Sequence, residues 1–219
     1  MTDDTEPIWL RAERAATGRP AERSRAEITA AAIAVADRGG LEAVSMRNVA
    51  DELGTGAASL YRYVNGRDDL LDLMVDATAA EPRLEPPTGD QVADLTAFAE
   101  ELRATMVRHP WLPELVLTRP SLGPNAVAAL DHVLDVLADH PGDGRAKLEI
   151  FALLNAVVAT FALNERAAAD RPEQAVAYLR HVAATGRRPR ITALLEDLAA
   201  PDDRHRGDAL TAILSGLLR

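Results

Sequence analysis

An all-α fold is predicted, with a small N-terminal domain of three helices and a larger helical domain after it. Apolar residues recur at three- and four-residue spacing along most of the 219-residue sequence, as they do on one face of an α-helix. Long runs of β-branched residues, which favour strands, are absent. Polar capping residues and glycine or proline stops stand at the ends of the periodic segments.

The first predicted helix begins at Ser24 and ends at Gly39-Gly40. Ser24 and Glu27 have the spacing of a capping box, in which each side chain bonds the other residue's backbone N–H. Glycine readily adopts the left-handed conformation that ends many helices. The buried face of this helix is predicted to consist of Ile28, Ala32, Val35 and Ala36.

Two short helices follow, separated by Gly54. Ser45 is placed to cap a helix that runs to about Leu53, and Thr55 to cap one that covers 56–64. Asn65-Gly66 is a turn signal. Two short helices joined by a tight glycine turn form a helix-turn-helix, whose second helix fits the major groove of DNA.

The exposed start of the 56–64 helix carries only small residues, which let the backbone approach base edges closely. Ser59 can hydrogen-bond a base or a phosphate, and the methyl groups of Ala57 and Ala58 can contact a thymine methyl. The hydroxyls of Tyr61 and Tyr63 suit phosphate oxygens. Arg62 can reach a phosphate or a guanine edge. Packing and surface roles for Tyr61 and Ser59 are the alternatives.

Further helices are predicted after this unit. A fourth covers 67–80, and a segment with three prolines at 81–87 separates it from the rest. The remaining helices are expected near residues 88–108, 125–138, 147–169, 173–185, 190–199 and 203–218.

Composition limits the kinds of protein that this chain can be. Hydrophobic residues make up 47% of it, which suffices for a core, and the absence of cysteine excludes disulfides and thiolate metal sites. No unbroken apolar run reaches the roughly 18 residues of a membrane span. The acidic first ten residues lack a signal-peptide pattern. We expect a cytoplasmic protein without a membrane partner.

The charge distribution matters more than the net charge of −10. Residues 11–67 contain nine arginines and seven acidic residues, so the helix-turn-helix is locally balanced on an acidic body. Insertion into the minor groove and a solvated tail are both open for the basic residues at its start. These are Arg11, Arg14, Arg19, Arg23 and Arg25.

Residues 24–76, above all VSMRNVADELGTGAASLYRYVNGRDDLLDLMV, resemble the DNA-binding domain of the TetR family. The resemblance implies that Arg47 reads a base and that Arg67 replaces the family's phosphate-binding lysine. Gly56 and Ala57 stand where larger polar residues occur in tetracycline repressors, so no operator sequence is implied. With the residues chosen above, the expected DNA contacts are Arg47, Thr55, Ala57, Ala58, Ser59, Tyr61, Arg62, Tyr63 and Arg67.

This resemblance implies three parts. They are a flexible arm (1–22), a helix-turn-helix DNA-binding domain (23–70) and an effector-binding and dimerisation domain (71–219). The implied function is that of a repressor which binds a palindromic operator as a homodimer and is released by a small molecule.

The helix near 147–169 is apolar almost all round, which predicts burial on several sides. Packing it and the last helix against their symmetry mates as a four-helix bundle would bury both. Ala156, Ala159 and Ala162 would allow close approach. Packing within one subunit is the alternative.

Residues 108–139 resemble, more loosely, the C-terminal domain of the tetracycline-repressor subgroup, with Thr118-Arg119-Pro120 at its ligand loop. The histidine that binds the drug's magnesium there falls on Leu115, and a nearby acidic residue falls close to Asn164. Leucine offers no atom to a hard cation. We therefore predict no binding of magnesium–tetracycline, and no metal or other cofactor.

An apolar pocket with a few polar anchors is expected in this domain. His132 and Asn155 could instead be buried polar groups, Phe151 and Phe161 core residues, and Arg119 part of a structural ion pair. The candidate pocket residues are His109, Trp111, Arg119, His132, Phe151, Asn155, Phe161 and Asn164.

Two other classes of protein are weighed against a DNA-binding regulator. The sequence has no HExxH, CxxC, GxSxG or glycine-rich phosphate loop, and its five histidines lack ligand spacing, so no catalytic residues are expected. A helical interaction protein that no longer binds DNA is compatible with the acidic body.

Overall fold

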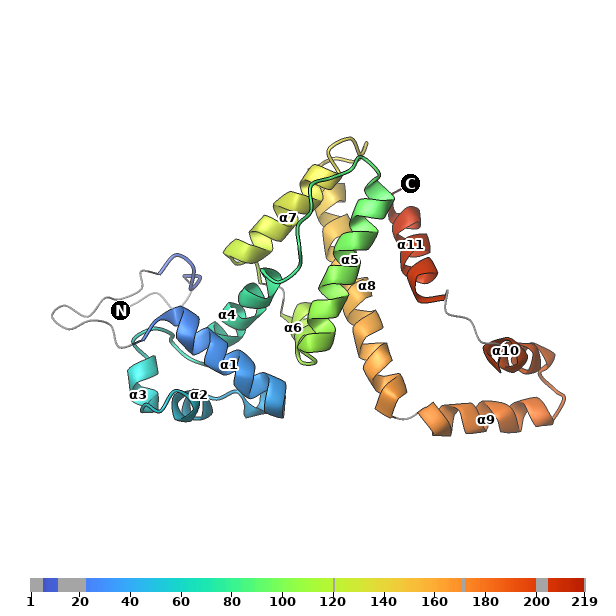
Figure 1. Cartoon of the computed structure of the whole chain (residues 1–219), viewed down its shortest axis with the longest axis horizontal. Helices are drawn as coiled ribbons and strands as arrows, with labels where there is room; N and C mark the ends of the chain where they lie inside the picture. Colours follow the sequence, from blue (N-terminus) through green and yellow to red (C-terminus); the bar gives the residue numbers. More distant parts are fainter. Residues whose placement is uncertain (1–5, 12–22, 120, 171, 200–204, 219) are drawn as a thin grey trace.

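The computed structural model describes residues 6–11, 23–119, 121–170, 172–199 and 205–218. These residues form helices joined by turns and loops, without a strand, and the predicted all-α fold is confirmed. In chain order the elements are α1 (Arg25–Gly39), the 3-10 turn η1 (Leu41–Ala43), α2 (Met46–Glu52), α3 (Ala57–Leu60), α4 (Arg67–Ala79), α5 (Gln91–Arg108), α6 (Leu112–Thr118), α7 (Pro124–Val136), α8 (Gly144–Asp170), α9 (Pro172–Ala184), α10 (Pro189–Ala199) and α11 (His205–Leu217) (Figure 1).

Local interactions set the ends of α1 and α2 as predicted. The Ser24 hydroxyl accepts the N–H of Glu27 at 3.1 Å, and the Glu27 carboxylate accepts the N–H of Ser24 at 2.7 Å. Gly40, with a φ of +74°, ends α1. Ser45 accepts the N–H of Asn48 at the start of α2. The two helices pack together through a fully buried apolar core that includes Ile28, Ala32, Val49 and Leu60.

The third helix is shorter than predicted. Regular helix in α3 covers four residues, and the turns after it direct the N–H groups of Tyr63 and Val64 back to the Leu60 carbonyl. Gly56 is the residue that precedes the helix, without a side-chain cap. The Thr55 hydroxyl instead lies 3.0 Å from the Ser59 hydroxyl, so the prediction that Thr55 caps this helix is wrong.

Helix α4 lies between the two parts of the molecule (Figure 1). It packs against α1 on one side and against α6 and α7 on the other, and it buries Leu70, Leu71 and Met74. The hydrophobic core therefore continues from α1 into the C-terminal helices. The boundary that we drew after residue 70 falls inside α4.

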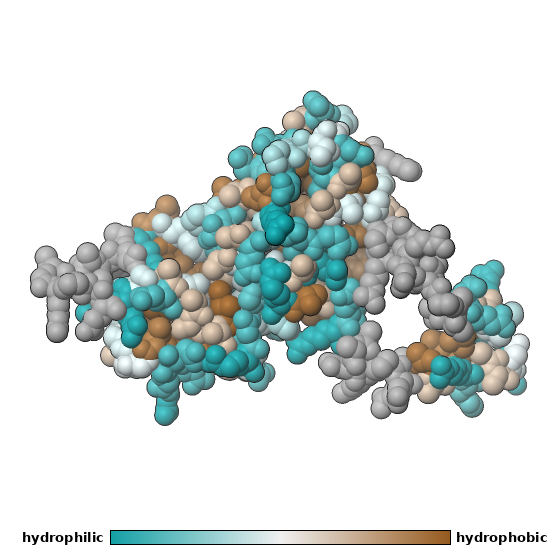
Figure 2. All heavy atoms as spheres, in the orientation of Figure 1, coloured by the Kyte–Doolittle hydropathy of each residue, from teal (hydrophilic) through white to brown (hydrophobic). Residues whose placement is uncertain are grey.

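The C-terminal helices surround α8, the longest one. Helices α5, α6 and α7 pack on it, and α11 packs on α5. Helices α9 and α10 contact each other and stand away from this body (Figure 1). Brown, hydrophobic side chains are visible on the face of the α9–α10 pair shown in Figure 2.

One described helix has the length and composition to cross a membrane, over residues 144–167 of α8. Core helices of water-soluble proteins share both properties. Fewer than a third of the residues in its most apolar stretch are buried in the single chain.

The described part of the predicted flexible arm is folded onto the protein. Ile8 is 2% exposed, and Trp9 packs against the core. The Arg11 guanidinium forms two hydrogen bonds with the Asp69 carboxylate of α4, at 2.5 and 2.8 Å. Residues 6–11 of the predicted arm are thus packed on the folded protein. Arg14 and Arg19 lie outside the described residues.

Candidate DNA interface and effector cavity

Four of the expected DNA contacts present exposed side chains on α2, α3 and the turn after α3. They are Arg47, Ala58, Tyr61 and Arg62. The Arg47 Nε atom lies 3.9 Å from an Asp51 carboxylate oxygen, and both side chains are mostly exposed. Such a pair is weak in water, so Arg47 is available to a base or a phosphate.

The Ser59 hydroxyl is held by its neighbours. It donates to the Gly56 carbonyl at 2.7 Å and lies 3.0 Å from the Thr55 hydroxyl. Because its own proton is used, its oxygen is left to accept. Amino groups of adenine or cytosine in the major groove are matching donors. Ala57, beside this pair, is half-buried against the core.

Tyr63 and Arg67 lie differently from the other expected contacts. Tyr63 is 5% exposed, which makes its ring part of the core, whereas Tyr61 is 56% exposed. The Arg67 guanidinium donates to the Val44 and Leu41 carbonyls at 2.9 and 2.8 Å. Arg67 therefore anchors η1, the turn that leads into α2, as well as standing exposed at the start of α4.

A cavity of about 310 Å³ lies among α4, α5, α6, α7 and α8. Apolar side chains dominate its walls, including Phe98, Leu102 and Leu122. Three of the predicted pocket residues line it, namely Arg119, Phe151 and Asn155. The Asn155 amide donates to the Phe151 carbonyl at 2.8 Å, which leaves its amide oxygen as the acceptor.

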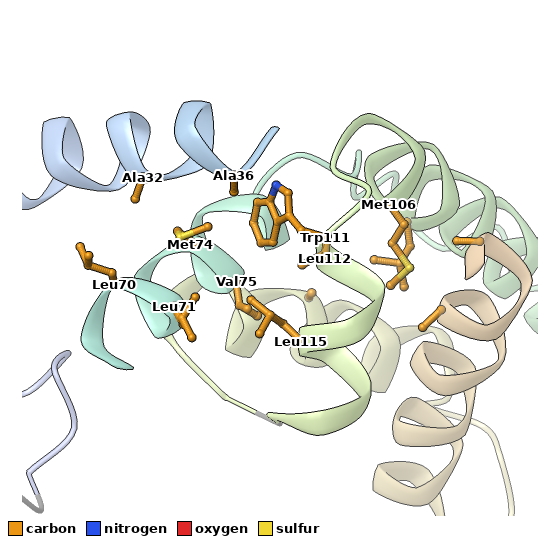
Figure 3. Close-up of a cluster of buried hydrophobic side chains, with 14 of the residues drawn as sticks. Ala32, Ala36, Leu70, Leu71, Met74, Val75, Met106, Trp111, Leu112 and Leu115 are labelled. Atoms are coloured by element: carbon orange, nitrogen blue, oxygen red, sulfur yellow. The ribbon is translucent and has the colours of Figure 1, made fainter. Parts of the chain in front are cut away.

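His109 and Trp111 lie outside this cavity, because both are turned toward α1. The His109 ring nitrogens lie 2.8 Å from an Asp37 oxygen and 2.9 Å from a Glu81 oxygen. The Trp111 indole N–H donates to the same Asp37 oxygen at 2.7 Å. Figure 3 shows the Trp111 ring near Ala36 and above α4. These residues join the start of α6 to the DNA-binding domain.

The other three predicted pocket residues are also placed elsewhere. The ring of His132 packs 5.7 Å from that of Phe98, and Phe161 borders a small hollow beside α11. Asn164 is exposed. Nine residues of helix rotate a side chain by about 180°, so Asn164 points away from the face that carries Asn155.

Acidic side chains of α4 bind the elements around the cavity, and sequence reasoning missed them. Asp72 and Asp68 accept hydrogen bonds from Arg119 at 2.9 and 2.8 Å. The bond to Asp72 is the main reason that the pKa of Arg119 is raised. Asp76 accepts the N–H groups of Asn125 and Ala126 at the start of α7. The four-residue spacing of these acids was the available signal, since it places them on one helix face.

Asp76 is 5% exposed, and burial raises its pKa against the opposing effect of the bonds from Ala126 and Asn125. In the described part of the chain, no three His, Asp or Glu side chains are grouped so that they could hold a metal ion.

Both parts of the chain match families of known proteins. Residues 28–74 match the profile described as bacterial regulatory proteins of the tetR family. Residues 81–219 match the tetracyclin repressor-like C-terminal domain. The chain is 34% identical over 225 residues to the HTH-type transcriptional repressor DrrR1 of Streptomyces coeruleorubidus, covering 97% of this chain and 83% of that protein.

The fold is similar to that of ActR from Streptomyces coelicolor. Its apo crystal structure has a TM-score of 0.78 and 30% identity, covering 90% of this chain and 95% of that one. ActR has also been solved with actinorhodin, at a TM-score of 0.75, 29% identity, and coverage of 90% of this chain and 96% of that one. From both family profiles and these relatives, we conclude that the chain belongs to the TetR family and is a DNA-binding transcriptional regulator, not an enzyme.

Proposed function

We propose that this protein is a cytoplasmic repressor that binds a palindromic operator as a homodimer and releases it when a small molecule fills the cavity. Two relatives support this function. DrrR1 is named a repressor, and ActR has been solved in complex with (S)-DNPA and with actinorhodin.

The observation that best supports this proposal is that α4 forms part of the cavity wall. Val75, Thr78 and Ala79 of α4 line the cavity, and Arg119 both lines it and binds α4 carboxylates. A ligand that displaces these side chains moves the helix that follows the DNA-binding helices. Release also requires that the ligand bind the non-DNA state more tightly than the DNA-bound state.

The cavity favours a mostly apolar, uncharged ligand. Arg119 is the charged residue among those that line it, and the carboxylates of Asp68 and Asp72 already offset its charge. Burial of an unpaired ligand charge among apolar walls would be costly. Asn155, Ser121 and Thr78 supply polar groups for orientation.

Dimerisation through α8 and α11 is supported by apolar side chains that the single chain leaves open. Leu153 of α8 is 47% exposed and Ile213 of α11 is 38% exposed. Ala159 and Ala162 are buried within the protomer, and Ala156 borders the cavity, so the larger apolar residues supply the proposed interface. Two subunits would place their α3 helices about one DNA turn, or roughly 34 Å, apart.

The test is a binding cycle with the duplex from upstream of the protein's own gene and with Nile red, an uncharged apolar dye, as the ligand probe. We expect a dimer by sedimentation, specific retention of the duplex, and a ligand affinity about 5–150-fold weaker for operator-bound than for free protein. A monomer that ignores the duplex at low salt would contradict the repressor function. Equal ligand affinities for the two forms would contradict release by the ligand.

A further inference from the structure

The segment of residues 6–11, here called the strap, contacts both parts of the protein. Its residues make turn hydrogen bonds from the N–H of Leu10 to the Pro7 carbonyl and from the N–H of Arg11 to the Ile8 carbonyl. Ile8 is 2% exposed and belongs to the continuous hydrophobic core. Burial of the Ile8 side chain therefore stabilises the packing of the strap on the rest of the protein.

Two arginines tie the strap to α1 and α4. The Arg25 Nη1 atom, from α1, donates to the carbonyls of Ile8 and Arg11 at 3.2 and 2.8 Å. Arg11 in turn pairs with Asp69 of α4, and their side chains are only 16% and 13% exposed. An ion pair with two hydrogen bonds that is mostly shielded from water stabilises a protein more than an exposed ion pair does.

The third contact is with the loop between α6 and α7. Gly123 lies so close to Asp76 and Trp9 that a methyl group on its α-carbon would collide with both side chains. Its neighbours Ser121 and Leu122 line the cavity. The strap therefore touches α1 of the DNA-binding domain, α4 and the cavity loop, and it connects the two parts of the protein.

We propose that the strap locks α4 between α1 and the α6–α7 loop, and that Arg11 is a positioning residue for operator binding. In this role Arg11 acts through Asp69 and contacts no DNA. The role in operator binding rests on the proposed function, whereas the locking of α4 is a property of the protein alone.

Hydrogen exchange of the full-length protein tests the lock without DNA or ligand. Arg11→Ala and Asp69→Ala are each expected to speed exchange in α4 and in residues 121–126. Arg188→Ala, which removes an exposed arginine from the α9–α10 loop, serves as the control and is expected to leave both regions unchanged. Unaltered exchange in both strap variants would overturn the proposal.

A double-mutant cycle on operator affinity tests the positioning role. Each single variant is expected to weaken binding about threefold to thirtyfold, and the double variant no more than Asp69→Ala alone, because that variant already removes the shared contact. The dependence of affinity on salt should stay as in the wild type. The cycle also separates this effect from the bond that Asp69 accepts from the N–H of Asn65.

The rival is a direct contact of Arg11 with phosphate. Arg11→Ala would then lower the salt slope by about 0.9, and Asp69→Ala, which frees Arg11, would not weaken binding. That pattern, or unchanged affinity in both variants, would overturn the positioning role. If the wild-type protein ignored the duplex, the proposed function would fail, and the exchange measurement would still decide for or against the lock.

Discussion

The carboxylate of Asp76 in α4 caps α7 by binding Asn125. Its Oδ1 atom accepts the backbone N–H of Asn125 at 2.9 Å, and its Oδ2 atom accepts the side-chain amide at 3.0 Å. Gly123, the residue before α7, has no side chain to cap it. A residue 49 positions earlier in the chain thus supplies the cap and joins α4 to the cavity wall.

The raised pKa of Asp76 predicts a pH dependence of stability. The folded protein binds the Asp76 proton more tightly than the unfolded chain does. The stabilisation that results is fully present below the unfolded pKa of about 3.9 and is lost as pH rises through the folded pKa. The free energy of unfolding of the wild type, relative to Asp76→Asn, should therefore fall with rising pH and then level off. Urea unfolding between about pH 4 and pH 8 measures it. A relative stability that rose with pH would contradict this assignment.

Tyr61 and Tyr63 form a matched pair for the DNA interface. Loss of the exposed Tyr61 hydroxyl in Tyr61→Phe should weaken operator binding about twofold to tenfold, the value of one hydrogen bond. Tyr63→Phe should leave operator affinity unchanged, because its ring is buried in the core. Fluorescence anisotropy with a labelled duplex checks both. The opposite ranking would place Tyr63 at the DNA.

Asp37 holds the start of α6 against α1. Asp37→Ala should lower the free energy of unfolding by about 1–3 kcal/mol, because it leaves the buried Trp111 N–H and a His109 nitrogen without their acceptor. Glu149→Ala, which breaks an exposed pair with Arg145, should cost less than about 1 kcal/mol. Equal losses in urea unfolding would show that the Asp37 contacts add nothing beyond a surface ion pair.

Filling the cavity with a side chain should block ligand binding. Ala156→Phe places a ring among the lining residues, whereas Ala128→Phe adds the same ring on the exposed face of α7. Nile red, an uncharged apolar dye, is expected to bind the wild type and Ala128→Phe, and to bind Ala156→Phe at least about tenfold more weakly. Titration by dye fluorescence measures this. Equal affinity in all three proteins would place the dye outside the cavity.

Magnesium–tetracycline should not bind. Leu115 is 5% exposed and offers no donor atom where the tetracycline-repressor subgroup has its metal-binding histidine. Isothermal titration with the drug and magnesium should show no saturable heat. A tight, magnesium-dependent affinity would refute this prediction.

The features that could be predicted from sequence are the local ones. Ser24 and Glu27 are three residues apart, so their capping box is visible in the sequence and sets the start of α1. Phe151 and Asn155, one turn apart on α8, share a face, and both line the cavity. The helical domains followed from the same short-range periodicity.

The features that were missed join residues far apart in the chain. His109 contacts Asp37, which lies 72 positions away in the sequence, and Arg11 contacts Asp69, 58 positions away. A local sequence pattern does not predict contacts between residues so far apart. An arginine in an acidic, arginine-rich stretch was therefore assigned to DNA or solvent. Phe161 was assigned to the pocket because the sequence does not reveal which face of α8 its neighbours cover.

The apolar walls of the cavity and the carboxylates of α4 have separate roles, and this separation has a practical consequence for biosensor design. Its walls are mostly alkyl and aromatic groups, whereas the contacts to α4 depend on carboxylates at its edge, those of Asp72 and Asp76. On the proposed function, substitutions at wall positions such as Leu102 or Ala152 are expected to change which inducer is recognised and to leave the contacts of Asp72 and Asp76 in place. Libraries of wall substitutions would then be a source of regulators that respond to new compounds at the same operator.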